Sequence, residues 1–132
     1  MPNITTVNDL QGKTEGLAIA ATADGYVGNN AGTSATLPTA STANVTYKVN
    51  NLVVGNNGTG AASVTIAFET PNSGATGFDT FPFITSVVIP AGSSLEVLSA
   101  PIYLNDRERL KISAVGEALD VIASYENLTT TS

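Results

Sequence analysis

Residues 85–127 read TSVVIPAGSSLEVLSAPIYLNDRERLKISAVGEALDVIASYEN, and this stretch decides the fold class. It consists of short apolar runs that are separated by turn-forming segments such as Pro90-Ala91-Gly92 and Asn105-Asp106. Strand-sized runs spaced by about 8 to 12 residues, with Gly, Pro and Asp between them, are typical of all-β sandwiches and barrels. No window shows the 3.6-residue apolar period of a helix of ordinary length. The stretch therefore predicts an all-β domain.

Strand-like runs also occur upstream of this stretch. The expected strands begin near Leu17, Asn44, Ala61, Phe81 or Ser86, Leu95, Ile102, Leu110 and Leu119. About eight antiparallel strands, joined by loops of uneven length, favour a two-sheet β-sandwich of the jelly-roll or Ig-like type over a closed barrel.

Three local features refine this prediction. The alternation of apolar and polar residues slips by one position at Asn50 and Asn51, which predicts a β-bulge. Pro82 lies between two phenylalanines, and because proline cannot donate to a sheet ladder, this part is expected at a sheet edge or at the start of a strand. Residues 115–118 form a turn of hairpin length between the last two expected strands.

The chain divides into an N-terminal arm (1–16), a β-sandwich domain (17–127) and a C-terminal tail (128–132). Apolar residues of the arm are spaced by three, at Ile4, Val7 and Leu10, but the Pro, Thr, Asn and Gly around them disfavour a free helix. The segment is either a frayed terminus or an arm that becomes ordered by adding to a neighbouring subunit.

The composition narrows the class of partner. The chain has 132 residues, no cysteine, no histidine and a net charge of −6. This length fits one domain that needs no disulfide or metal to fold. The net negative charge argues against nucleic acid and against an anionic membrane surface as binding partners. The N-terminus lacks a basic start and an apolar core, so no signal peptide is expected, and no apolar run reaches the roughly 18 to 20 residues of a membrane span.

No catalytic, cofactor-binding or metal site is expected. The glycine-rich residues 25–32 match neither a P-loop nor a dinucleotide fingerprint. Asp106 and Glu108 are two residues apart, as the carboxylates of a glycosidase pair might be. Arg107 and Arg109 lie between and beside them, which favours a solvated ion-pair turn. The sequence therefore predicts a protein that is not an enzyme.

The segment 105–111, NDRERLK, is the most distinctive part of the predicted surface. It holds three of the five cationic residues of the chain. The segment is either a charged turn that protects an edge strand or a patch that meets an acidic partner. Arg107, Glu108 and Arg109 are therefore candidate interface residues, together with the three apolar residues of the arm.

Four motifs carry a resemblance to a known family. IPAG at 89–92, LEVL at 95–98, PIYL at 101–104 and the final strand ending in SYE at 124–126 resemble the C-terminal half of small virion proteins of tailed bacteriophages. Together with the upstream strand and turn, the resemblance covers roughly residues 37–127.

The chain departs from the family pattern at one turn. The family has Gly-Asp ahead of a leucine, where this chain has Arg107-Glu108 ahead of Leu110. If the glycine normally supplies a positive φ, this turn is expected to be built differently, with Arg107 placed for contact.

The resemblance implies a non-enzymatic virion protein. The first expectation is a capsid decoration (cement) protein that binds and stabilises the phage head shell, and the alternative is a neck or tail component. A third possibility is a carbohydrate- or receptor-binding module, for which Tyr26 is the one tyrosine expected in a loop. The implied partners are the major capsid protein or other virion subunits and further copies of the chain, with a trimer favoured. The implied location is the virion, at the capsid surface, after synthesis in the host cytoplasm.

Overall fold

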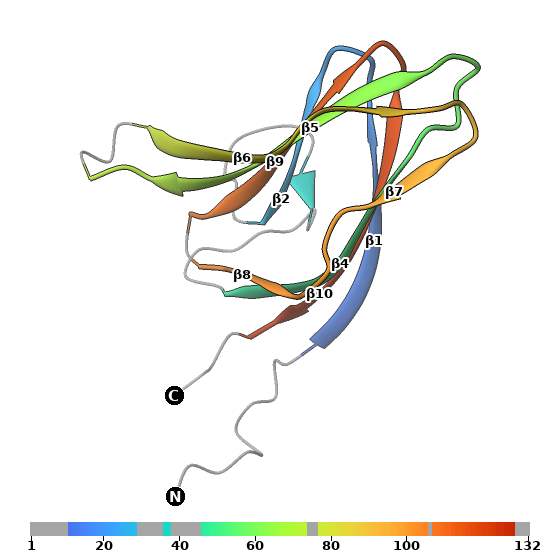
Figure 1. The fold of residues 1–132 in the computed structure, drawn as a ribbon. Helices are drawn as coiled ribbons and strands as arrows, with labels where there is room; N and C mark the ends of the chain where they lie inside the picture. Colours follow the sequence, from blue (N-terminus) through green and yellow to red (C-terminus); the bar gives the residue numbers. More distant parts are fainter. Residues whose placement is uncertain (1–10, 29–35, 38–45, 74–76, 106, 129–132) are drawn as a thin grey trace, which may run out of the picture.

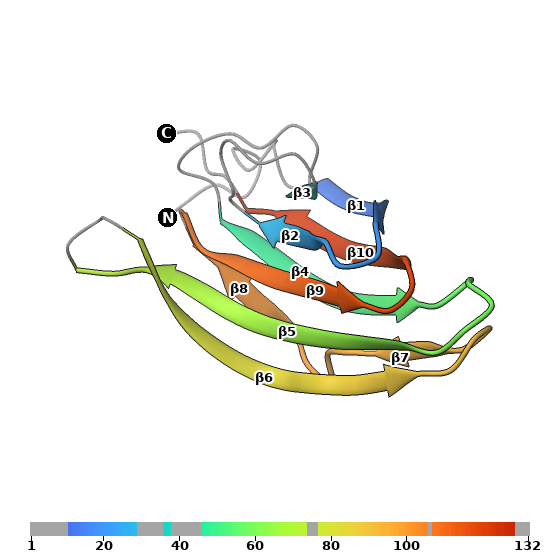
Figure 2. The same ribbon diagram turned by 90° about the horizontal axis from the view of Figure 1, so that it is seen from above.

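The computed structural model of the chain describes residues 11–28, 36–37, 46–73, 77–105 and 107–128. All regular secondary structure within these residues is β-strand, which confirms the predicted all-β class. In the described part of the chain, no helix is long and apolar enough to cross a membrane. The strands form two sheets, which Figures 1 and 2 show as two layers.

Each sheet contains five strands. The first sheet has the order β1-β10-β4-β7, with β8 also paired to β4. Its strands are β1 (Gln11–Ile19), β4 (Tyr47–Gly55), β7 (Ser94–Glu96), β8 (Ile102–Leu104) and β10 (Leu119–Asn127). The second sheet has the order β3-β2-β9-β5-β6. Its strands are β2 (Asp24–Gly28), β3 (Thr36–Leu37), β5 (Ala62–Pro71), β6 (Phe78–Ile89) and β9 (Arg109–Val115).

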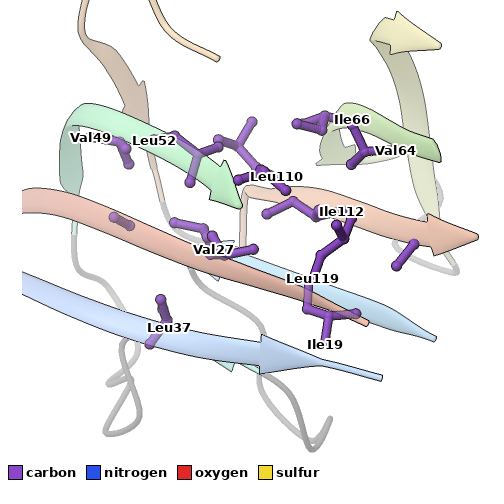
Figure 3. Close-up of a cluster of buried hydrophobic side chains, with 14 of the residues drawn as sticks. Ile19, Val27, Leu37, Val49, Leu52, Val64, Ile66, Leu110, Ile112 and Leu119 are labelled. Carbon is purple, nitrogen blue, oxygen red and sulfur yellow. The ribbon is translucent and has the colours of Figure 1, made fainter. Parts of the chain in front are cut away.

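The core lies between the two sheets. Because successive side chains of a strand point to opposite faces, one face of each inner strand lies in the core. In β9, for example, Leu110, Ile112 and Ala114 are buried and the residues between them are not. Figure 3 shows Leu110 and Ile112 of β9 beside side chains from the opposite sheet, among them Leu52 of β4. Burying a side chain of this size stabilises the fold by about 1.5–3 kcal/mol relative to leaving it exposed.

The predicted β-bulge in β4 is confirmed. The register against β10 shifts at Asn50, which lies between the paired residues Val49 and Asn51. Val49 and Leu52 are three residues apart, yet both are fully buried. The extra residue at the bulge therefore returns the side chains that follow it, beginning with Leu52, to the buried face of the strand.

The N-terminal third departs most from the prediction. The described residues hold ten strands in place of about eight, and residues 11–16, expected in the arm, belong to β1. Main-chain pairing with β10 along the whole of β1 holds this polar strand, so its side-chain pattern did not reveal it. β2 lies between Leu17 and Asn44, where no further strand was expected to begin. A Cβ at Gly25 of β2 would lie 2.5 Å from Ile19 Cδ1, so any other residue there would displace the buried Ile19 side chain.

A buried tyrosine also holds β1 against the first sheet. The Tyr125 hydroxyl of β10 donates a hydrogen bond to the Glu15 carboxylate of β1. The Tyr125 ring packs edge-on against Tyr47, with ring centroids 5.6 Å apart. Burial of Tyr125, followed by the hydrogen bond and the charge of Glu15, raises the pKa of its hydroxyl above the ordinary value.

The turn at residues 115–118 does not close a hairpin. β9 belongs to the second sheet and β10 to the first, so the turn carries the chain from one layer to the other. Gly116 has a φ of +100°, and a Cβ there would lie 3.1 Å from the Ala61 carbonyl oxygen. The prediction failed because a turn of this length fits a hairpin and a passage between layers equally well.

A buried asparagine fixes the turn between β4 and β5. Asn56 is fully buried, and its Nδ2 donates to the carbonyl oxygens of Gly60 and Ile89. Its Oδ1 accepts a hydrogen bond from the Gly58 amide. One side chain therefore satisfies three main-chain groups and ties this turn to the end of β6.

Candidate functional site

An open apolar cleft lies where the edges of the two sheets meet. One wall is β6, the outer strand of the second sheet, and the other is the segment 97–102, which links β7 to β8 along the first sheet. The volume of the cleft is about 320 Å³. Its lining residues are Phe83, Val97, Leu98, Ser99, Ala100, Pro101 and Ile102. None of these side chains is charged, so the cleft suits an apolar occupant.

The first sheet opens here because its outer strand is interrupted. β7 pairs with residues 53–55 of β4 and β8 with residues 47–49, on either side of the bulge. Between them, the Val97 amide donates to the Leu52 carbonyl oxygen, and the chain then passes through Pro101, which has no amide hydrogen. The bulge and the proline thus separate β7 from β8 and leave the wall of the cleft uncovered.

β6 presents apolar side chains to solvent. Phe81 is 57% exposed, Phe83 45% and Val88 60%. β6 pairs only with β5 among the described strands, which confirms the predicted edge position of this segment. The β5–β6 ribbon also extends beyond the other strands at one end, on the left of Figures 1 and 2.

The backbone of β6 is poorly suited to pairing with another strand along its length. Its register against β5 shifts twice, opposite residues 64–67. Ser86 has a φ of 50°, and its amide donates to Thr65 Oγ1. Bulges and an internal proline are the devices that protect edge strands from continuous pairing. The exposed side chains of β6 are therefore better placed for contact than its main chain.

The turn around residues 105–109 corrects one sequence prediction. Arg107 is exposed and has a φ of 65°, so the arginine takes the left-handed conformation expected of the family's glycine. Glu108 is half-buried; its carboxylate accepts hydrogen bonds from the Asn105 amide and from Thr70 Oγ1. The prediction that this turn is built differently is therefore wrong: Arg107 adopts the positive φ itself and stores strain there, and the two hydrogen bonds to Glu108 hold the turn closed.

Arg109 faces other residues of its own sheet. Its Nε lies 2.7 Å from Glu69 Oε1, and only 13% of the arginine side chain and 7% of the glutamate side chain are exposed. Its guanidinium carbon lies 4.3 Å from the ring centroid of Tyr26 and 3.9 Å from that of Phe78. Arg109 thus stabilises the second sheet and has little exposed surface left to contribute to the predicted interface patch. Tyr26 lies in β2 beneath this arginine, in contrast to the expected loop.

The remaining sequence candidates lie outside the described residues. Ile4, Val7 and Leu10 belong to residues 1–10, and so does most of the expected arm. Within the described residues, no group of three or more carboxylates could hold a metal ion.

The sequence does not reveal the cleft. Residues 95–104 carry ordinary strand and turn signals, and whether their apolar side chains are covered depends on the opposite sheet. The one local signal is Pro82 between Phe81 and Phe83, which predicts an edge strand with large apolar side chains. No protein-family model matches the chain, and no curated protein matches it significantly in sequence.

Proposed function

We propose that this chain is a structural protein of a bacteriophage virion, most simply a capsid decoration (cement) protein that binds the head shell. The observation that carries the proposal is the gathering of exposed apolar side chains on β6 and in the adjoining cleft. Contiguous apolar patches of a few hundred Å² mark surfaces that bind another protein, and this cluster would form one part of such a surface. The phage assignment itself rests on the resemblance of residues 37–127.

The strand order supports a jelly-roll sandwich. With the two-residue β3 set aside, and β7 and β8 taken as two pieces of one strand, eight strands remain. Successive strands then alternate between the sheets except at the β5–β6 hairpin. Eight strands in two Greek keys make a jelly roll, a fold used by viral capsid proteins and lectins.

The size of the apolar surface suits binding in a repeated array. The exposed parts of Phe81 and Phe83 amount to about 200 Å². A stable interface between two proteins buries about 800 Å² on each partner. One contact through this surface is therefore weak, and stable attachment requires several contacts per copy or many copies side by side.

The copy number in the intact particle tests the proposal. A decoration protein is expected in many copies, in proportion to the capsid subunits, as measured by quantitative mass spectrometry of purified virions. A single ring of six or twelve copies would instead identify a neck or tail component. Absence of the protein from purified virions would refute both assignments.

Matched substitutions test the surface. Phe81→Ser is expected to lower the number of copies per particle, because it removes exposed apolar area from β6. Ile122→Ser is the control, since Ile122 is 49% exposed on the outer face of the first sheet. Equal occupancy by the two variants would rule out β6 as the attachment surface.

A further inference from the structure

The cleft between β6 and residues 97–102 lacks an occupant among the described residues. Its walls are apolar, from Phe83 on one side to Leu98 and Ile102 on the other. Exposed apolar side chains of β6 occur from Phe81 to Val87, a span of at most about 20 Å at 3.3 Å per strand residue, because the bulges shorten it. An occupant should therefore be a narrow segment with several apolar side chains along one side.

Residues 1–10 have this pattern. Ile4, Val7 and Leu10 are spaced by three, and Asp9 is the only charged side chain in the segment. In a polyproline II conformation, with three residues per turn and a rise of 3.1 Å, these side chains would form one ridge about 19 Å long. The ridge therefore matches the exposed row on β6 in length and in polarity.

The position of β1 decides which copy supplies the segment. Gln11 pairs with Asn127, Asn127 with Tyr47, and Tyr47 with Leu104 of β8. The start of β1 thus lies three strand spacings, about 14 Å, from β8.

The chain's own segment is too short to use its full ridge. A fully extended chain carries Val7 at most about 14 Å from Gln11, no farther than β8 itself, and Leu10 less than 4 Å. The cleft lies beyond β8, toward β6. In its own cleft a chain could therefore place only Ile4, whereas a neighbouring chain can place all three residues.

We propose that the cleft binds residues 1–10 of a second copy of this chain, with Ile4, Val7 and Leu10 against β6 and residues 97–102. The contact is head-to-tail, so three copies can close into a ring if the rotation between them permits. This inference deepens the proposed function by naming the contact between copies. The contact between copies does not depend on the virion assignment; only the role of that contact in the virion rests on the proposed function.

Disulfide trapping between two single-cysteine variants tests the proposal, because the chain has no cysteine of its own. Val7→Cys is mixed with Ser99→Cys, whose exposed serine lines the cleft. Under mild oxidation the mixed disulfide is expected to form at least tenfold faster than between Val7→Cys and Ser93→Cys. Ser93 is an exposed serine in the turn before β7 and does not line the cleft.

Three outcomes would overturn the proposal. The first is equal trapping at Ser99 and Ser93. The second is a Val7→Cys/Ser99→Cys double variant that closes within one chain. The third is preferential pairing of Ser99→Cys with itself, which would indicate contact between two clefts.

A second measurement does not depend on cysteine chemistry. Val7→Asp is expected to reduce the oligomeric mass in sedimentation, while Thr6→Asp, which adds the same charge beside the ridge, leaves it unchanged. Equal effects of the two variants would overturn the proposal. These experiments use the purified protein, so their failure is distinct from the failure of the virion assignment, which the copy number decides.

Discussion

Removing the charge of Arg109 should destabilise the fold strongly. Arg109→Met keeps most of the aliphatic stem but removes the guanidinium that lies over the rings of Tyr26 and Phe78, and it leaves the buried Glu69 without its ionic partner. Breaking a buried ion pair at one side costs about 3–5 kcal/mol. The lower end applies here, because Glu69 keeps its hydrogen bond from Thr80 at 3.0 Å. We therefore expect a loss of about 3 kcal/mol.

Urea titration measures this loss. With an m value of about 2 kcal/mol/M, the midpoint should fall by about 1.5 M. Lys111→Met is the matched control on the same strand, since Lys111 Nζ lies 3.8 Å from Asp24 Oδ2 and its side chain is 35% exposed. An exposed pair of this kind contributes less than about 1 kcal/mol. Similar losses in the two variants would refute the buried-pair argument.

A double-mutant cycle isolates the pair itself. Glu69→Gln combined with Arg109→Met removes both charges, so the double variant should lose about 2 kcal/mol less than the sum of the single variants. Losses that add to within about 0.5 kcal/mol would show that Arg109 acts through packing alone.

Three further predictions concern single side chains. Asn56→Ala should lower the free energy of unfolding in urea by about 2–3 kcal/mol, because three main-chain groups lose their partner, whereas a comparable loss in the exposed Asn57→Ala would contradict this. Arg107→Gly should raise the melting temperature, because glycine adopts the positive φ without strain. After the greater flexibility of glycine in the unfolded chain is subtracted, the free energy of unfolding should rise by about 0.5–1 kcal/mol. A lower melting temperature would mean that contacts of the arginine side chain outweigh its backbone strain. Tyr125 has a raised pKa in the fold, so the stability it contributes is complete below about pH 10 and is lost as the pH rises further. Urea titrations between pH 8 and 11 should show a smaller alkaline loss in Tyr125→Phe than in the wild type, and parallel losses would contradict the assignment.

The sequence alone determined the all-β class, the bulge at Asn50 and the edge position of residues 81–83. Each depends on a local property: the two-residue alternation, a one-residue slip in that alternation, and the missing amide hydrogen of Pro82. Such properties are readable from neighbouring residues, because the strand geometry that they report is itself local.

Tertiary structure decided what these local patterns could not. The polar strand β1 forms because β10 offers it a main-chain partner, and the turn at 115–118 changes layers because its two strands belong to different sheets. In the sequence, Arg109 cannot be distinguished from an exposed arginine. It is largely buried because Glu69 of β5, which lies far away in the sequence, pairs with it in the second sheet. The cleft likewise exists because two edges distant in sequence meet without covering each other. Pairing and burial between distant segments depend on which surfaces meet in space, which the sequence pattern of a single strand does not encode.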